Sequence, residues 1–139
     1  MAGTKNFSTL FLFLFLQFCT TKIIVRAKIH VRVVNRLGDG QSLALHCQSR
    51  DDDLGNVVLE NDKETEWSFK VNFLGSTLFH CDVKWGRLNT WYSFDAYDAN
   101  RDYARCRSEC RWMISNDGSL YGYDEQYESW VWFPLRMKI

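Results

Sequence analysis

Hydrophobic and polar residues alternate with a period of two through most of the chain after residue 28. Ile29, Val31 and Val33 are separated by His30 and Arg32, and the same alternation recurs in five later stretches, at residues 42–47, 66–71, 77–85, 91–94 and 110–114. Short apolar runs at 120–123 and 130–135 complete the series. This alternation is typical of half-buried β-strands, because successive side chains of a strand point to opposite faces.

Turn residues separate these strands. Asn35–Gly40 contains two glycines, Gly75 lies between two strand patterns, and Asn116-Asp117-Gly118 is a strong hairpin signal. We expect only single helical turns, at Leu54–Glu60 and Ala99–Arg105. The pattern therefore predicts an all-β protein, an antiparallel β-sandwich of about eight short strands with an Ig-like architecture. We expect the six Trp, the six Tyr and much of the Phe to form its core.

The N-terminus has the pattern of a secretory leader. Lys5 precedes the apolar run Leu10–Phe18, which is shorter than the roughly 20 residues that a membrane-spanning helix needs. We expect a signal peptide over 1–27, cut after Ala27 or, alternatively, near Thr20 or Thr21, and a mature domain over 28–139. This organisation predicts a secreted, extracellular protein whose mature chain does not insert into a membrane.

Four of the five cysteines remain when the leader, with Cys19, is removed. In an oxidising compartment these four favour two disulfides. The strand phase places Cys47, Cys81 and Cys110 on inward faces. Cys106 and Cys110 are separated by only three residues, so we do not expect them to pair with each other. This leaves Cys47–Cys110 with Cys81–Cys106, or the swapped pairs, and we favour the first because it could join facing sheets.

Charge and spacing exclude several classes of site. The mature chain has 14 basic and 17 acidic residues, which is no footprint for binding nucleic acid. His46 and His80 precede cysteines, but neighbours on a strand face opposite ways, and the spacings of structural zinc sites are absent. Asp51–Asp53 lacks the glycine and glutamate spacing of a calcium loop, so we interpret it as a solvated turn whose side chains accept backbone hydrogen bonds. We expect no metal and no cofactor.

The sequence gives little support to the hypothesis of a catalytic site. Asp95, Asp98 and Asp102 could supply paired carboxylates, but scattered acids on a polar loop are usually surface charge. A secreted ribonuclease would need two juxtaposed histidines and a cation, for which His46, His80 and Lys84 are available. No nucleophile elbow, P-loop or zinc-protease motif is present. We therefore expect no enzymatic activity.

The residues around the cysteines resemble a known family. The block His46–Gly55 (HCQSRDDDLG), the block Trp67–Trp85 and the block Cys106–Tyr121 follow one another as in the plant self-incompatibility S-proteins and their homologues. The resemblance covers roughly Lys28 to Leu135. It implies a small secreted β-sandwich with two disulfides and no catalytic residues. Founding members of that family act as stigma ligands for a pollen membrane receptor.

In a sandwich stapled by disulfides the loops can vary while the scaffold persists, so we expect recognition to lie in the loops. We expect exposed loops at Asn35–Gln41, Asn61–Thr65, Gly86–Thr90 and Asn100–Arg107, besides the acidic turn of the family, which comprises Asp51, Asp52, Asp53 and Gly55. Aromatic and Arg anchors dominate many interfaces, and the candidates for contact with a receptor are Arg87, Trp91, Arg101 and Tyr103. We expect a monomeric ligand of a plasma-membrane receptor on a plant cell. The alternatives are a secreted hydrolase, such as a ribonuclease, and a secreted defence protein.

Overall fold

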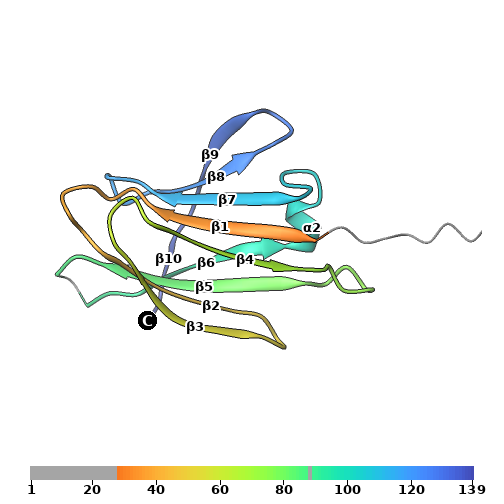
Figure 1. Ribbon diagram of the computed structural model, residues 1–139, viewed down its shortest axis with the longest axis horizontal. Coiled ribbons are helices and arrows are strands. Elements are labelled where there is room, and N and C mark those ends of the chain that lie inside the picture. The colour runs from red at the N-terminus through yellow and green to blue at the C-terminus, as the bar shows by residue number, and fades with distance from the viewer. Residues whose placement is uncertain (1–27, 88) are drawn as a thin grey trace, which may run out of the picture.

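The computed structural model describes residues 28–87 and 89–139, so the expected leader at 1–27 lies outside the described residues. Strands dominate this part of the chain, and the elements in chain order are β1 (Ile29–Asn35), β2 (Leu43–Gln48), β3 (Asp53–Leu59), β4 (Glu64–Phe69), β5 (Leu78–Trp85), β6 (Tyr92–Asp98), α2 (Ala99–Asp102), β7 (Glu109–Ile114), β8 (Leu120–Asp124), β9 (Ser129–Phe133) and β10 (Arg136–Met137). They form a two-layered sandwich (Figure 1).

Each layer is a five-stranded sheet. Sheet A has the strand order β4-β1-β7-β8-β9, and sheet B has the order β10-β6-β5-β2-β3. The predicted β-sandwich is confirmed, with two strands more than the expected eight. The antiparallel expectation fails at one place, because β1 and β7 run parallel, with Val33 opposite Trp112. The parallel pair arises because both strands enter sheet A from the same end of the sandwich (Figure 1).

As predicted, the alternating hydrophobic residues of the strands form the core. In β1 every second side chain is buried, and β7 shows the same phase. Val31 and Val33 of sheet A and Leu43 and Val83 of sheet B are fully buried, together with Trp112. The two sheets therefore bury their inner faces against each other, which is the arrangement expected when hydrophobic residues recur at every second position.

Of the two helical turns expected from the sequence, one is present and the other is a strand. Residues Asp53–Leu59 form strand β3, paired with β2, so the helical turn expected over Leu54–Glu60 is wrong. β3 is an edge strand, and most of its side chains are exposed, which weakened the alternation. The second expected turn is confirmed as α2, whose N-cap residue Asp98 accepts hydrogen bonds from the backbone of Asn100 and Arg101.

Two disulfides are present, as predicted, but the favoured pairing and its swapped alternative are both wrong, and the pair Cys106–Cys110 that we did not expect exists. The bonds are Cys47–Cys81 and Cys106–Cys110. Cys47 and Cys81 are register partners on neighbouring strands of sheet B, with Cα atoms 4.1 Å apart. The chain folds back between Cys106 and Cys110, so their Cα atoms lie 5.1 Å apart despite the short separation. Neither bond joins the facing sheets, although all four cysteines are buried, including the three that the strand phase placed on inward faces.

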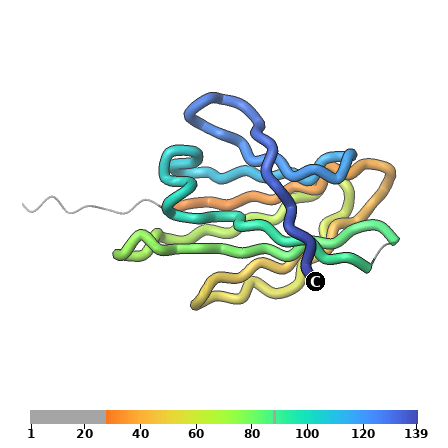
Figure 2. Tube along the Cα trace, turned by 180° about the vertical axis from the view of Figure 1, so that it is seen from behind, coloured from red at the N-terminus to blue at the C-terminus, as the bar shows by residue number. Residues whose placement is uncertain are grey.

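The C-terminal segment connects the two sheets. After β9 the chain leaves sheet A, passes Pro134 and adds β10 beside β6 in sheet B (Figure 2). Lys138 anchors this segment, because its backbone N–H donates to the carbonyl of Trp91 at 2.9 Å and its Nζ lies 2.6 Å from Oδ2 of Asp82. Sheet A and sheet B are therefore joined by covalent crossings and apolar packing rather than by cystine.

Candidate functional site

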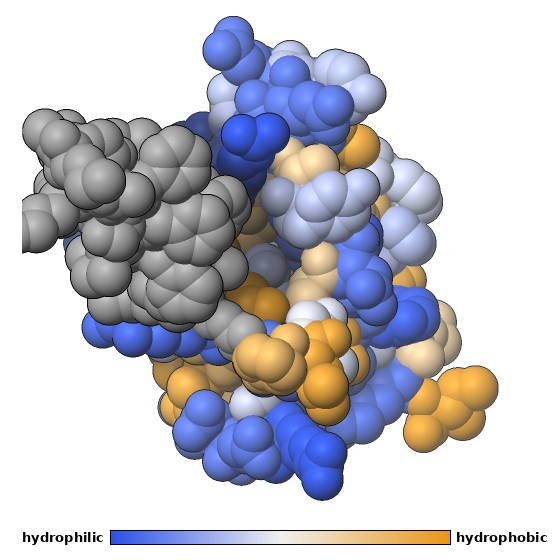
Figure 3. Space-filling model, turned by 90° about the vertical axis from the view of Figure 1, so that its right-hand side faces the viewer, coloured by the Kyte–Doolittle hydropathy of each residue, from blue (hydrophilic) through white to orange (hydrophobic). Residues whose placement is uncertain are grey.

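Three connections of interest lie at one end of the sandwich, which we call the loop end. The turn at 49–52, the β4–β5 loop at 70–77 and the segment 99–108 all lie where β2, β4 and β6 end and β3, β5 and β7 begin. In Figure 1 this end is on the right, and Figure 3 views it face on, with orange hydrophobic side chains standing among blue polar ones.

The acidic turn is ordered by its own side chains. The Ser49 backbone N–H donates to the Asp52 carbonyl at 2.7 Å, and the Asp52 N–H donates to Oγ of Ser49 at 3.1 Å. Oδ1 of Asp53 accepts from the Gly55 N–H at 2.9 Å and lies 2.6 Å from Nε2 of His46. These contacts, with the Gly55 bond the larger, lower the pKa of Asp53 below its usual 3.8. The interpretation of a solvated turn whose aspartate accepts a backbone hydrogen bond is confirmed.

An open groove of about 670 Å³ separates this turn from the β4–β5 loop. Its lining is mixed polar and apolar and includes residues 48–52, 76–80, Phe69, Lys70 and Asn72. At the tip of the β4–β5 loop the side chains of Phe73 and Leu74 are 87% and 85% exposed. Large apolar side chains that protrude beside a groove are a feature of binding surfaces rather than of cores.

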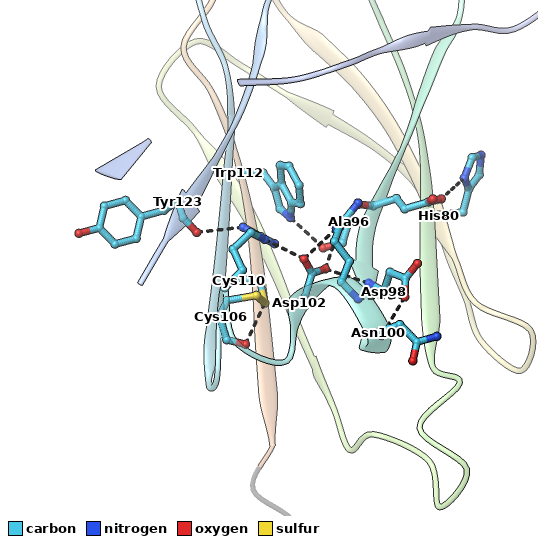
Figure 4. A network of polar contacts seen from close by, with 12 residues as sticks. His80, Ala96, Asp98, Asn100, Asp102, Cys106, Cys110, Trp112 and Tyr123 are labelled. Carbon is cyan, nitrogen blue, oxygen red and sulfur yellow. Dashed lines mark hydrogen bonds and ion pairs between the residues drawn. A yellow bond between two sulfur atoms is a disulfide. The ribbon is translucent and has the colours of Figure 1, made fainter. Parts of the chain in front are cut away.

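Asp102 is the centre of a buried polar network at the same end (Figure 4). Its side chain is fully buried, and its Oδ1 accepts from Nε of Arg105 at 2.7 Å and from Nε of Arg101 at 2.8 Å. Its Oδ2 accepts from Nη2 of Arg101 and from the Asp98 backbone N–H. Burial alone would raise the pKa of Asp102, but the two arginines outweigh it and hold the pKa below its usual 3.8.

The network attaches the segment 99–108 to sheet A. Nη1 of Arg105 donates to the Tyr123 carbonyl at 2.9 Å, and the Arg105 guanidinium lies 4.4 Å from the centre of the Trp112 ring. The Arg105 carbonyl in turn accepts from the Glu125 N–H at 2.7 Å. With Cys106–Cys110 closing the corner, this loop is fixed from both sides. Loops held in this way can present side chains in a preset geometry.

His46 and His80 lie on the outer face of sheet B, as the strand phase predicts, with 27% and 34% of their side chains exposed. Each has a carboxylate partner, since His46 contacts Asp53 and Nδ1 of His80 lies 3.0 Å from Oδ1 of Asp95. Lys84 lies further along β5 and donates to Asn89. The imidazoles therefore link strands and turns.

Within residues 28–87 and 89–139 no group of three or more His, Cys, Asp or Glu side chains could hold a metal ion. In that same part of the chain no helix is long and apolar enough to cross a membrane.

Comparison with known proteins assigns the family. The family model for plant self-incompatibility protein S1 matches residues 30–133. The chain belongs to this family. It is 40% identical over 111 residues to the self-incompatibility protein S1 of Papaver rhoeas, covering 79% of this chain and 78% of that protein. The S-protein homolog 24 of Arabidopsis thaliana is 45% identical over 83 residues, which is 60% of this chain and about half (53%) of that relative.

A solved structure has the same fold. It is described as that of SPH (self-incompatibility protein homologue) proteins, a widespread family of small, highly stable, secreted proteins from plants. The TM-score is 0.61 at 19% identity, and the match covers 80% of this chain and 99% of that one. This likeness shows that the two-sheet fold of the chain is the fold of that SPH structure.

The structure separates the predicted contact residues of this family member. Tyr103 is 73% exposed at the loop end, on the same end as the acidic turn. Arg101 is also there, but its guanidinium is occupied by Asp102 and by the carbonyl of Asp95. Arg87 is exposed at the opposite end, and half-buried Trp91 lies near it with Nζ of Lys84 5.3 Å from its ring. The four residues therefore do not form one surface.

An aromatic surface on sheet A escaped the sequence reasoning. Trp130 and Trp132 of β9 are 39% and 59% exposed, and Tyr127 in the preceding turn is 71% exposed, so the expectation that nearly all aromatics form the core is wrong in part. Tyr123 stacks edge-on against Trp130, with ring centres 5.4 Å apart. The signal available in the sequence was the run Ser129–Phe133, which is apolar on both faces and therefore cannot be wholly buried in an edge strand.

Proposed function

We propose that this chain is a secreted, non-enzymatic signalling ligand that binds a receptor on the plant cell surface and acts in recognition between cells, such as that of pollen by the pistil. The kinship with the poppy self-incompatibility protein supports the pollen role. The expected leader at 1–27 supports secretion. The loop end is the observation that carries the proposal.

The loop end combines rigidity with exposure. The Asp102 network and Cys106–Cys110 hold the segment that presents Tyr103, while Phe73 and Leu74 protrude beside the groove. Immobilised loops lose less conformational entropy on binding, so more of the contact energy contributes to affinity. Asp53, Asp95 and Asp102 and the imidazoles of His46 and His80 are engaged in hydrogen bonds that order turns and strands. This chemistry suits recognition better than catalysis.

The test is saturable binding. The protein is produced in a plant host with its own leader, so that the mature N-terminus can be sequenced and is expected to begin at Lys28. Labelled protein is then titrated onto plasma-membrane vesicles from pollen and, separately, from leaf. We expect binding that saturates and is displaced by unlabelled protein. Binding that rises linearly with concentration on both preparations would contradict a receptor ligand.

Matched variants locate the contact. The double change Phe73→Ser with Leu74→Ser should weaken binding at least about tenfold, because apolar side chains that become buried on binding carry much of the energy of an interface. Val58→Ser is the control, since Val58 is also exposed, at 68%, but lies on the β3 edge away from the loop end. Equal loss in both variants would exclude the loop end as the contact surface.

A further inference from the structure

Strand β9 is an open edge of sheet A. It pairs with β8 on one side and ends the strand order on the other. Its five residues, Ser129–Phe133, carry no charge, and Trp130, Val131 and Trp132 are 39%, 38% and 59% exposed. The β8–β9 hairpin rises from the body of the sandwich at the top of Figure 1, so this edge is accessible. Long uncharged edges are templates for pairing with another strand.

The ladder shows which backbone groups of β9 face outward. The Ser115 N–H donates to the Ser119 carbonyl at 2.9 Å where the β7–β8 hairpin closes. Hydrogen-bonded and non-bonded pairs alternate along an antiparallel ladder, and successive residues direct their N–H and C=O groups to opposite sides of the strand. By this alternation Gly122 faces β9 and its partner Val131. The N–H and C=O groups of Trp130 and Trp132 then point away from β8, toward the open edge.

The outer face beside this edge carries an aromatic surface with one cation. We define it by Arg111, Tyr121, Tyr123, Trp130 and Trp132, which occupy adjacent outward positions of β7, β8 and β9. The Arg111 guanidinium lies 4.1 Å from the centre of the Tyr123 ring and 5.5 Å from that of Trp130. Among residues 28–87 and 89–139 no acidic side chain forms an ion pair with Arg111. Trp, Tyr and Arg are the residues most enriched at interface hot spots.

We infer that the β9 edge accepts an extended strand from the protein part of the receptor, so that sheet A gains a sixth strand, and that an acidic surface of the receptor covers Arg111. This inference rests on the proposed function and names a second contact surface for it, besides the loop end. The outward backbone groups favour a protein strand over a glycan, because main-chain pairing is the mode by which peptides add to a sheet edge. A second copy fits less well, because it would add another uncompensated Arg111 to the same face.

The experiment compares two substitutions at one position. Trp132→Val removes the indole but keeps the outward N–H, whereas Trp132→Pro removes the N–H as well. Proline is tolerated in an edge strand where its missing N–H faces solvent, so the β8–β9 ladder should survive. On the plasma-membrane vesicles that bind the wild-type protein, we expect the Pro variant to bind at least about tenfold more weakly than the Val variant. Circular dichroism and the urea midpoint verify that both variants are folded.

Two further measurements keep the inference testable if Trp132→Pro does not fold. In the wild-type protein the amides of Trp130 and Trp132 should exchange hydrogen quickly, and they should become protected when the protein is saturated with vesicles. Arg111→Gln should weaken binding, whereas Arg36→Gln, which changes an exposed arginine that pairs with Asp62 at the opposite end of the sandwich, should not. Unchanged exchange at both tryptophans in the bound state would overturn the inference.

The remaining outcomes separate the inference from the proposed function. A wild-type protein that shows no saturable binding contradicts both. Saturable binding that is equal in the Pro and Val variants leaves the receptor ligand intact and overturns the edge as its contact. Binding that survives protease digestion of the vesicles would assign the aromatic surface to a glycan or lipid and overturn the inference. A wild-type dimer in sedimentation that only Trp132→Pro abolishes, with vesicle binding unchanged, would assign the edge to a second copy.

Discussion

The two edges of sheet A are built differently. At the β4 edge the outward positions carry Glu64 and Glu66, which pair with Arg32 of β1 at 3.8 Å and 3.2 Å. His30 also contacts Glu66 at 3.0 Å. At the β9 edge the outward positions carry Trp130 and Trp132. Charged side chains protect an edge against pairing, so the β4 edge is closed to other strands and the β9 edge is not.

The two edges also differ in the interactions that hold their strands in place. The ion pairs of β4 are about half exposed, and such pairs contribute roughly 0–1 kcal/mol each. The β8–β9 hairpin is instead held from within, since Arg105 links buried Asp102 to the carbonyl of Tyr123. The β9 edge is therefore both unpaired and held by a buried network. A preformed site that accepts a strand needs these two properties together.

The largest loss of stability should come from removing the Asp102 carboxylate, the centre of the buried network. Asp102→Ala leaves Arg101 and Arg105 without their carboxylate, and breaking a buried ion pair costs about 3–5 kcal/mol. We expect a loss of this size in the free energy of unfolding, measured by urea denaturation, with faster amide exchange in β8 and β9 than in β4. Equal loosening at both edges would show that the network does not single out the β9 side.

The lowered pKa of Asp102 predicts that the folded protein loses stability in acid. Because the pKa of Asp102 is lower in the folded protein than its usual 3.8, its contribution to stability is complete above that value and disappears as pH falls through the lower folded pKa. The urea midpoint should therefore decline below about pH 4. Asp102→Asn should show a shallower decline than the wild-type protein between pH 5 and pH 2.5. A decline of the same steepness would contradict this assignment.

Gly122 tests the packing under β9. A Cβ atom at this position would lie 2.8 Å from Cζ3 of Trp112, 2.9 Å from Nη1 of Arg105 and 3.0 Å from Cε2 of Phe133. Gly122→Ala should destabilise the protein by about 1–3 kcal/mol, because these crowded groups must move. Ser129→Ala on exposed β9 is the control and should stay within about 0.5 kcal/mol of the wild-type protein in thermal denaturation.

The buried disulfide Cys106–Cys110 should contribute less to stability than Cys47–Cys81. Cys106 and Cys110 close a very short loop, and the chain-entropy model gives about 2 kcal/mol for it, against about 4 kcal/mol for the 34-residue separation of Cys47 and Cys81. Changing both cysteines of each pair to Ser, in separate variants, should reproduce that order in urea midpoints. A larger loss from the short loop would indicate that it also supports the Asp102 network.

The smallest effect is expected at the β4 edge. Arg32→Gln removes the exposed pairs with Glu64, Glu66 and Glu109, and we expect a loss below about 1 kcal/mol that disappears in high salt. The informative readout is association. With the carboxylates left uncompensated the β4 edge stays charged, so the variant should remain monomeric in sedimentation. Dimers formed through β4 would show that charge is not what closes this edge.

Local pattern predicted much of this molecule, because strand alternation and turn chemistry depend on neighbouring residues. It located nearly all strands, the inward cysteines and the helical turn at Ala99–Asp102. It failed for β3, whose edge position exposes both faces, and for the parallel pairing of β1 with β7. In the site it identified the acidic turn and Tyr103 as exposed, but it placed Asp102 on the surface with Arg101, where the structure shows Asp102 fully buried beneath a partly exposed Arg101.

The sequence by itself determined the family, the two-sheet architecture and the inward phase of the cysteines, since each depends on residues close together in the chain. Only the tertiary structure decided which cysteines pair, because Cys47 and Cys81 meet through the register of β2 with β5. It also decided that the two edges of sheet A differ. Alternation shows which residues share a face, whereas strand order decides which faces and edges are left without a neighbour.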